Sequence, residues 1–498
     1  MATPGLDVRI GRFRPNSDSL RSDLSRRPLT GASATGPSTV GRLTVLVMLL
    51  ALAGQGCRAR TDSRASAEEP PTIADRPRTL DSRQWVLVPS GGRSPLDVEI
   101  RRLQERLRSA ESSPRGFERL GWTFVRRGRR HQDPGDYRLA RHAAEVLLQK
   151  DPQDAGGLLL FGYALHSLHH FAEAEVVARQ LVDQRGLSFD YGLLGDALVD
   201  QGRLEEAAAA YQSMMDIRPG AQAFARAAHL LWLLGDDAAA LRAWRKATSA
   251  VGPRNADTWA WMVSQRALHE LRLGNVNVAR SLVDAMRTRS YVNDSVSFKT
   301  ISARVAWAEG DCRTALDSLG SESEMRLASQ RWLFIDLAQA CGNSARAQRA
   351  ERELVSSLGH LDPRGLALFL STRRVQVQRA VDLASKEIQL RRDVFTLDAL
   401  AWAHFAAGNV EAGGKLMKEA LAVGNRDARL HLHAALLARS EGRHQHAARH
   451  LEVARRGRYT LFPSELAILD RSLDSPGSGP QPSRLHRTNH PRPGQPSP

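Results

Sequence analysis

A six-residue phrase recurs along the chain from residue 135 onward: a glycine, then Asp, Asn or Arg, and a small residue five positions after the glycine. It occurs eight times, beginning at Gly135, Gly202, Gly235, Gly274, Gly310, Gly342, Gly408 and Gly442. Apolar runs typical of helices stand before and after the copies. Glycine suits the left-handed residue that ends a helix, and Asp or Asn can cap the helix that follows. The phrase predicts the turn of a helical hairpin, with the small residue where the two helices approach closely.

The copies are evenly spaced. Measured between the small residues, successive steps are 34, 33, 33, 39, 36, 32, 33, 33 and 34 residues. Two members lack the glycine: His169 precedes Ala174, and Val375 precedes Ala380. A period in the low thirties made of helix-turn-helix units indicates a stacked repeat array. The predicted fold class is therefore all-α.

Composition and charge favour an array over a single large core. Of the 498 residues, 42% are hydrophobic and 6% aromatic, which suits many small helical contacts. The formal net charge is +16, and residues 1–95 carry 14 Arg against 8 acids while 471–498 carry 4 Arg against 1 acid. The centre mixes both signs, whereas nucleic-acid binders usually concentrate a basic stripe beside aromatic residues. We expect no specific nucleic-acid partner.

The N-terminal segment, 1–57, has the features of a lead followed by a signal-like element. Residues 1–42 are rich in Arg, Ser, Thr, Pro and Gly and are predicted to be disordered. The apolar run Leu43–Ala53 is too short to span a bilayer comfortably and has the length of a signal-peptide core. Gly56-Cys57 after this run resembles a bacterial lipobox, in which the cysteine is acylated, although Gln55 and Gly54 depart from its usual residues. A buried core helix and an uncleaved anchor are the alternatives, and the true start of translation could lie near Val40.

The rest of the chain divides by composition into three parts. Residues 58–95 are predicted to be a flexible tether, interrupted by a possible short strand at Gln84–Val88. A helical stripe begins at Leu96, and the array is expected to run from 96 to 470. Residues 471–498, rich in Pro, Ser, Gly and Arg, are predicted to be a disordered tail.

Within the array, residues 188–221 carry a specific signature. Tyr191, Leu194, Gly195, Leu198, Ala207, Tyr211 and Pro219 fall on the spacing of the tetratricopeptide repeat, which the chain resembles over about ten units. The resemblance implies a right-handed α-solenoid whose first helices line a concave groove that holds peptides or partner helices, and it names no ligand.

Projecting the first helices onto that groove selects residues of the types that anchor protein interfaces. The candidates are Tyr163, His166, Asp196, Asp200, His229, Trp232, Arg304, Trp307, Asp336 and Trp402. Packing between repeats is the competing interpretation for any single aromatic residue among them.

The remaining chemistry-bearing residues give weaker signals. Cys312 and Cys341 lie near the turns of successive units and could form a disulfide in an oxidising envelope if their Cα atoms approach within about 7 Å; free thiols are the alternative. His444, His446 and His450 share one helix, but no Cys or carboxylate completes a metal-ligand set, so surface histidines are favoured. No nucleophile elbow, phosphate loop or dinucleotide fingerprint is present, and no catalytic, cofactor or metal site is predicted.

Two functional hypotheses follow. The first is a non-enzymatic adaptor, exported and held at the cell envelope through an N-terminal anchor, that binds a protein segment in its groove. The second is a cytoplasmic or membrane-tethered regulator whose basic tails contact nucleic acid or anionic lipid, with binding that falls steeply with salt.

Overall fold

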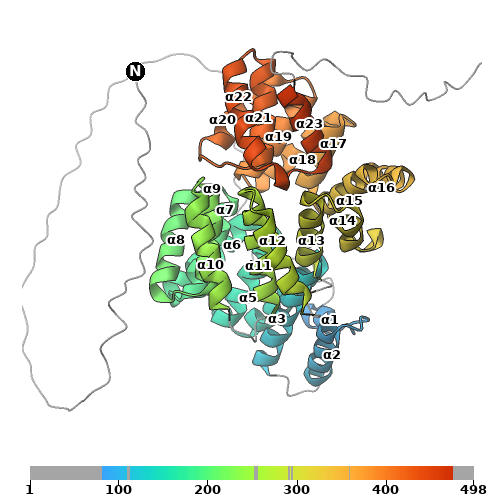
Figure 1. Ribbon diagram of the computed structural model, residues 1–498. Helices are drawn as coiled ribbons and strands as arrows, with labels where there is room; N and C mark the ends of the chain where they lie inside the picture. Colours follow the sequence, from blue (N-terminus) through green and yellow to red (C-terminus); the bar gives the residue numbers. More distant parts are fainter. Residues whose placement is uncertain are drawn as a thin grey trace, which may run out of the picture. The chain divides into compact units, whose positions relative to one another are not determined.

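Ten helical hairpins follow one another in the computed structural model, which describes residues 81–108, 113–251, 256–289, 292, 295–357, 359 and 361–474 (Figure 1). Hairpins 1 to 5 are α3 (Pro114–His131) with α4 (Pro134–Lys150), α5 (Ala155–Ser167) with α6 (Phe171–Gln184), α7 (Ser188–Asp200) with α8 (Leu204–Ile217), α9 (Ala221–Leu233) with α10 (Asp237–Ala250), and α11 (Ala256–Arg272) with α12 (Val276–Arg287). Hairpins 6 to 10 are α13 (Val296–Ala308) with α14 (Cys312–Leu319), α15 (Ala328–Ala340) with α16 (Ser344–Ser356), α17 (Pro363–Arg373) with α18 (Val377–Leu390), α19 (Val394–Ala406) with α20 (Val410–Leu421), and α21 (Ala428–Ser440) with α22 (His444–Arg456). These residues contain no strand, so the predicted all-α solenoid of about ten units is confirmed.

The recurring phrase forms the turns that the sequence predicts. Seven of its eight glycines, all except Gly135, have φ between +74° and +88°, a region in which a side chain is strained. In hairpin 1 the left-handed residue is Gln132 instead, at φ 51°, and Gly135 already lies within α4. His169 (φ 66°) takes the place of the missing glycine in hairpin 2, and Arg374 and Gln376 take it in hairpin 8. The turn geometry is therefore kept even where glycine is absent.

The small residue of each phrase packs where the two helices meet. Nine alanines at this position are at most 2% exposed: Ala140, Ala174, Ala207, Ala240, Ala279, Ala315, Ala347, Ala380 and Ala447. At the tenth, a Cβ on Gly413 would lie 2.9 Å from the carbonyl oxygen of Ala401. A larger side chain would push the helices apart, which explains the restriction.

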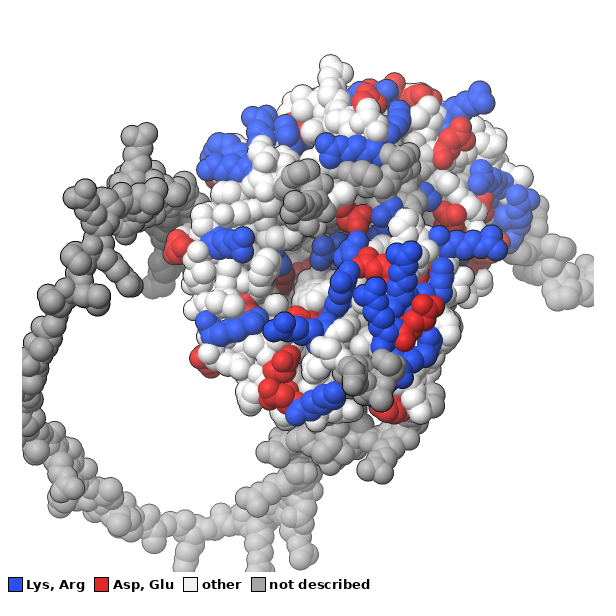
Figure 2. Space-filling model, turned by 90° about the horizontal axis from the view of Figure 1, so that it is seen from below, with Lys and Arg blue, Asp and Glu red and all other residues white. Residues whose placement is uncertain are grey.

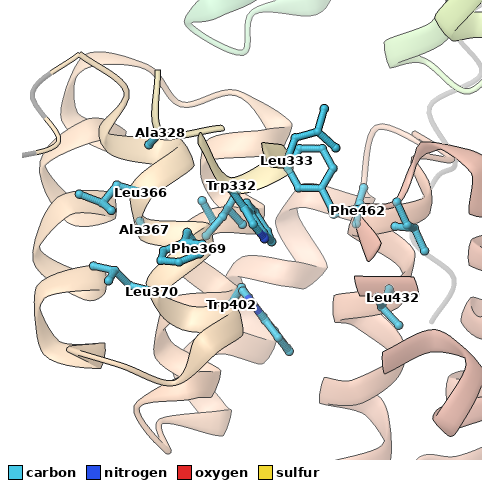
Figure 3. Packing of buried hydrophobic residues seen from close by; sticks show 14 of the residues in the cluster. Ala328, Trp332, Leu333, Leu366, Ala367, Phe369, Leu370, Trp402, Leu432 and Phe462 are labelled. Carbon is cyan, nitrogen blue, oxygen red and sulfur yellow. The ribbon is translucent and has the colours of Figure 1, made fainter. Parts of the chain in front are cut away.

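Larger apolar side chains fill the space between neighbouring hairpins. In the C-terminal half, Trp332 of α15 is 1% exposed and packs against Phe369 of α17 and Phe462, with ring centroids 6.0 and 4.8 Å away (Figure 3). Leu366, Leu370 and Trp402 belong to the same cluster. No single centre holds the whole array, because each hairpin buries its apolar face against the next.

The predicted flexible tether is wrong for its last residues. Residues 81–95 include a helix, α1 (Ser82–Leu87), and α2 (Pro95–Arg108) follows at once. Val86 of α1 is fully buried, and the Gln104 Nε2 donates hydrogen bonds to the carbonyl oxygens of Val86 and Val88 at 2.8 and 2.6 Å. The possible strand at Gln84–Val88 is therefore mostly helix. A six-residue helix held by one apolar side chain and by side chain–backbone bonds has too few residues to show a helical period.

Other segments differ less or lie outside the description. At the C-terminal end, α23 (Pro463–Asp474) continues four residues past the predicted boundary at 470. The predicted lead, the apolar run, Cys57, residues 58–80 and most of the tail lie outside the described residues. Among the described residues, no helix is both long and apolar enough to span a bilayer.

Hairpin turns in the first half of the array contact connecting segments in the second half, and we call this set of contacts the seam. In hairpin 1, Gln132 and Asp133 contact Gln330 and Arg326, where hairpin 6 leads into hairpin 7, at 2.9 and 3.3 Å. In hairpin 3, a Cβ on Gly202 would lie within 3.0 Å of the carbonyl oxygen of Arg392, between hairpins 8 and 9.

The same relation continues along the array. In hairpin 4, a Cβ on Gly235 would meet the carbonyl oxygen of Gly424, between hairpins 9 and 10, at a similarly short distance. In hairpin 5, Gly274 faces Tyr459 of the short helix η4 (Arg458–Thr460), which follows hairpin 10. Each of these turns lies against the segment that follows the hairpin five places later.

Candidate binding cavity

A cavity of about 450 Å³ lies on the inner side of hairpins 1 to 5, and we call it the first cavity. Five of the predicted groove residues line it, mostly from the first helices of their hairpins: Tyr163, His166, Asp196, Asp200 and His229. Because the seam brings the segment between hairpins 8 and 9 across this side, Arg391 also lines the cavity. The predicted groove residues therefore line a partly open cavity on this side of the array.

Two ion-pair clusters define the polar part of the first cavity. Arg226 binds Asp196 through two hydrogen bonds of 2.8 and 2.6 Å, and the hydroxyl of Tyr211 donates to the same carboxylate at 2.8 Å. Arg391 contacts Asp200 at 2.5 Å and Asp393 at 2.6 Å. Both carboxylates of the first half that face the cavity are therefore held by guanidinium groups.

His166 joins the cluster around Asp200. Its Nε2 lies 2.9 Å from a carboxylate oxygen of Asp200. Burial lowers the pKa of His166, but the hydrogen bond and the charge of Asp200 outweigh it and raise the pKa above its ordinary value. Burial alone would raise the pKa of Asp200, but Arg391 and His166 outweigh this effect and hold the pKa well below its usual range. The pair therefore favours a charged imidazolium beside a carboxylate.

A second cavity, of about 340 Å³, shares Val199, Asp200, His229 and Arg391 with the first. It also exposes the predicted residues Trp232 and Arg304, together with Arg272, Arg364 and Arg429. Trp232 is 7% exposed and stacks on Phe395 of α19, with ring centroids 5.2 Å apart and planes 16° apart. Hairpins 3 to 6 and 8 to 10 all supply residues to this cavity.

The other three predicted groove residues serve packing and lie in neither cavity. Trp402 is 4% exposed and stacks on His433 with centroids 4.1 Å apart. Asp336 is 2% exposed, pairs with Arg373 at 2.6 Å and accepts hydrogen bonds from Ser464. Burial raises the pKa of Asp336 to about 6, against the opposing effects of Arg373 and Ser464. Trp307 is half-buried and packs against the apolar cluster that contains Trp332.

Sequence reasoning missed six cavity arginines, of which Arg364 and Arg429 lie on the first helices α17 and α21. Arg129 and Arg226 lie on α3 and α9, and the guanidinium of Arg129 bonds the Tyr163 hydroxyl, so projection of the first helices could have found both. Arg272 ends α11, a first helix from which the projection selects no residue. Arg391 follows α18 in a connecting segment, and only the seam brings it to the cavities.

The structure places the cysteine candidates in a disulfide and one of the histidine candidates beside a second histidine. Cys312 and Cys341 form a disulfide, with Cα atoms 5.6 Å apart, that joins the turns of hairpins 6 and 7. His450 lies 2.9 Å from His431 between their Nδ1 atoms, and the described residues hold no group of three or more possible metal ligands.

Comparisons with known proteins give a distant likeness. No family model and no curated protein sequence matches the chain. Among solved structures, the human IFIT1 dimer with PPP-AAAA is similar at 14% identity and a TM-score of 0.39, covering 66% of this chain and 77% of that one. The Cut9–Hcn1 hetero-tetramer of APC/C is similar at 12% identity and 0.33, covering 79% and 100%. Yeast Tom70 is similar at 12% and 0.30, covering 76% and 91%. At these scores the likeness carries no argument about function.

The fold assignment rests on the ten hairpins of the chain itself. The chain is an all-α solenoid of helical hairpins.

Proposed function

We propose that the protein is a non-enzymatic scaffold that binds a short segment of a partner protein in its inner cavities. The observation that supports this proposal is the first cavity, in which Tyr163, Trp261 and several charged side chains converge from separate hairpins. Its volume of about 450 Å³ is in the range of ligand sites, roughly 300–1,000 Å³. A whole helix is about 10 Å across, so a cavity of this volume suits an extended segment or a few anchoring side chains better.

Mixed charge at the cavity suits recognition of a peptide. Asp196 and Asp200 lie beside Arg226 and Arg391, while Tyr163 and Trp261 offer aromatic surface. Tyr, Trp and Arg are the residues that most often dominate binding energy at protein interfaces. The arrangement favours a segment that carries both an apolar anchor and a polar group.

Photo-cross-linking tests this proposal directly. A photoreactive residue at Gln265, which lines the first cavity, should capture a partner peptide in the native host, whereas one at Val176, which is 68% exposed on α6, should not. Tyr163→Ala should reduce capture at Gln265. Equal capture at both positions, or capture that Tyr163→Ala leaves unchanged, would reject the cavity as the binding site.

We propose further that the protein acts at the bacterial cell envelope. The apolar run Leu43–Ala53 and the lipobox-like Gly56-Cys57 support export, and the Cys312–Cys341 disulfide suits an oxidising compartment. Mass spectrometry of the native N-terminus tests this part. A mature chain that begins at an acylated Cys57 is expected, and a native peptide from residues 1–39 would overturn it.

The alternative role is a cytoplasmic or membrane-tethered regulator that contacts nucleic acid or anionic lipid through its basic ends. Residues 1–95 carry the 14 Arg that favour it, and most of them precede the described part. On the face that Figure 2 shows, basic and acidic side chains are intermixed, which gives this role no broad basic surface on that face. Recovery in the soluble cytosol, with binding lost steeply as salt rises, would replace the envelope proposal by this one.

A further inference from the structure

Two arginines in the second cavity make no ion pair with any carboxylate of the described residues. The guanidinium of Arg272, at the end of α11, lies over the Trp232 ring at 3.9 Å, and its buried Nε has no hydrogen-bond partner. Arg304, on α13, donates one hydrogen bond of 2.8 Å to the carbonyl oxygen of Thr460 and lies 4.8 Å from the ring centroid of Phe462. Ring contacts and one neutral acceptor do not neutralise a guanidinium charge.

The other three arginines of this cavity are paired. Arg364 lies 3.3 Å from Asp393, Arg391 contacts both Asp200 and Asp393, and Arg429 forms two bonds to Glu465. The unpaired state of Arg272 and Arg304 is therefore specific to them.

The carboxylates that line the second cavity are already engaged. Asp200 and Asp393 bind Arg391. Asp398 lies 2.8 Å from His433, and Asp427 accepts from the backbone N–H of Arg429 at 3.0 Å, where it caps α21. Asp427 keeps its charge near Arg272 and Arg304, but no lining acid forms an ion pair with either arginine.

The pKa values of both arginines agree with this uncompensated charge. Burial lowers the pKa of Arg304 to about 10, and the nearby Arg429 and Arg272 add to the effect against Glu465 and Asp427. Burial also lowers the pKa of Arg272, with only partial relief from Asp427 and Asp237. An anion in the cavity would add an attraction that raises the pKa of both arginines.

We infer that the second cavity binds an oxyanion, the carboxylate or phosphate group of a ligand, between Arg272 and Arg304. Guanidinium groups offer planar pairs of N–H donors that match both groups. Arg272 and Phe395 cover the faces of the Trp232 ring, so Phe395 and the edge of Trp232 are the aromatic surface that this cavity offers to the ligand's apolar part. This inference deepens the proposed function, on which it rests for the source of the anion: an acidic side chain, a phosphorylated side chain or a chain terminus of the partner segment.

Small anions test the site without any partner. The full chain is titrated with methyl phosphate and, in a second arm, with acetate, each against sodium chloride at matched ionic strength, while calorimetry and thermal unfolding are followed. At least one of the two anions should bind with one site per chain and raise Tm saturably. The stronger arm tells whether the natural group is a phosphate or a carboxylate.

The variant series is R272Q, R304Q and the double variant, with R313Q as the matched control, because the Arg313 side chain is 93% exposed. Each single variant should weaken anion binding about tenfold or more, the double variant should abolish it, and R313Q should leave it unchanged. R272Q removes no hydrogen bond of the Arg272 Nε, so it keeps the test usable if R304Q fails to fold.

Two outcomes would overturn the inference: no saturable binding of either anion to the unaltered chain, or binding that the double variant retains in full. Neither bears on the cross-linking test, which reports partner capture at Gln265. Failure of anion binding with capture intact rejects the oxyanion site alone. Anion binding without partner capture rejects the scaffold proposal alone.

Discussion

The turns of hairpins 3 and 4 and those of hairpins 9 and 10 share one phrase and one backbone shape, yet they have different surroundings. Gly202 and Gly235 have φ of 77° and 79°, and a Cβ on either would meet a backbone oxygen of the second half. Gly408 and Gly442 have φ of 88° and 74°, and a Cβ on either would find nothing within 4 Å. The phrase therefore encodes a turn, whereas contact between distant hairpins depends on where the coil of the array carries that turn.

The largest expected difference comes from alanine at matched turns. Gly408→Ala places a side chain at positive φ and should lower the free energy of unfolding by about 1–2 kcal/mol. Gly235→Ala adds a clash with the Gly424 backbone and should cost about 4 kcal/mol. Urea denaturation of the two variants measures this. Equal losses would show that the seam does not form in solution.

The turns of hairpins 6 and 7 take no part in the seam, and a disulfide joins them to each other. Cys312 and Cys341 enclose a sequence separation of 29 residues, and replacing both by Ser should lower the free energy of unfolding by about 3 kcal/mol. A reducing agent should lower the stability of the unaltered chain to a similar extent and leave the double variant unaffected. A reducing agent without effect on the unaltered chain would mean that the two thiols are free.

The ion cluster at the seam should matter more than an exposed pair on an open hairpin. Arg391→Gln leaves Asp200 and Asp393 without their main partner and should cost about 2 kcal/mol, less than a fully buried pair because the cavity admits some water. Glu411→Gln breaks the pair with Lys415, whose side chains are 85% and 76% exposed, and should cost less than about 0.5 kcal/mol. Thermal unfolding of both variants makes the comparison; similar small losses would show that the cluster at the seam is no better shielded from water than an exposed pair.

A smaller effect than the loss expected for Arg391→Gln is a pH dependence beside the turn of hairpin 4. His269 is fully buried, its Nε2 donates to the carbonyl oxygen of Asp237 at 2.8 Å, and burial lowers its pKa to about 4. Below pH 6.5 the unfolded chain binds a proton that the folded chain excludes, so stability is lost as pH falls from 6.5 toward 4.

His269→Gln retains an amide donor and cannot titrate. The unaltered chain should therefore lose about 1 kcal/mol more than the variant between pH 7 and pH 5.5. Denaturation midpoints at the two pH values give this difference. A variant with the same pH slope as the unaltered chain would assign the slope to other groups.

The sequence predicts what is local and regular in this fold. The hairpins, their left-handed glycines and buried alanines such as Ala207 and Ala240 all follow from the phrase and its period, because they depend on residues within one unit or its neighbour. The helix α1 could not be predicted in this way, since it depends on Gln104 and on a single buried valine.

The site was predictable only in part. Tyr163, His166, Asp196, Asp200 and His229 reach the first cavity because they lie on inward faces of first helices, as the projection assumes. Asp336 and Trp402 satisfy the same projection and are buried instead, because Ser464 and His433 from later segments cover them. The position of Arg391 at the cavity depends on the pitch of the array. The pitch results from small rotations added over several hairpins, and no local sequence pattern predicts it.

The five-place offset of the seam has a consequence for how such a chain can change its length. An open array of repeats tolerates loss or duplication of a unit, since each unit touches only the next. Here, deleting one hairpin between the third and the eighth would bring every later connecting segment one place out of step, and Gly202 and Gly235 would face the wrong backbones. The seam thus fixes the number of hairpins in the array. A descendant with fewer or more hairpins would lose the seam contacts.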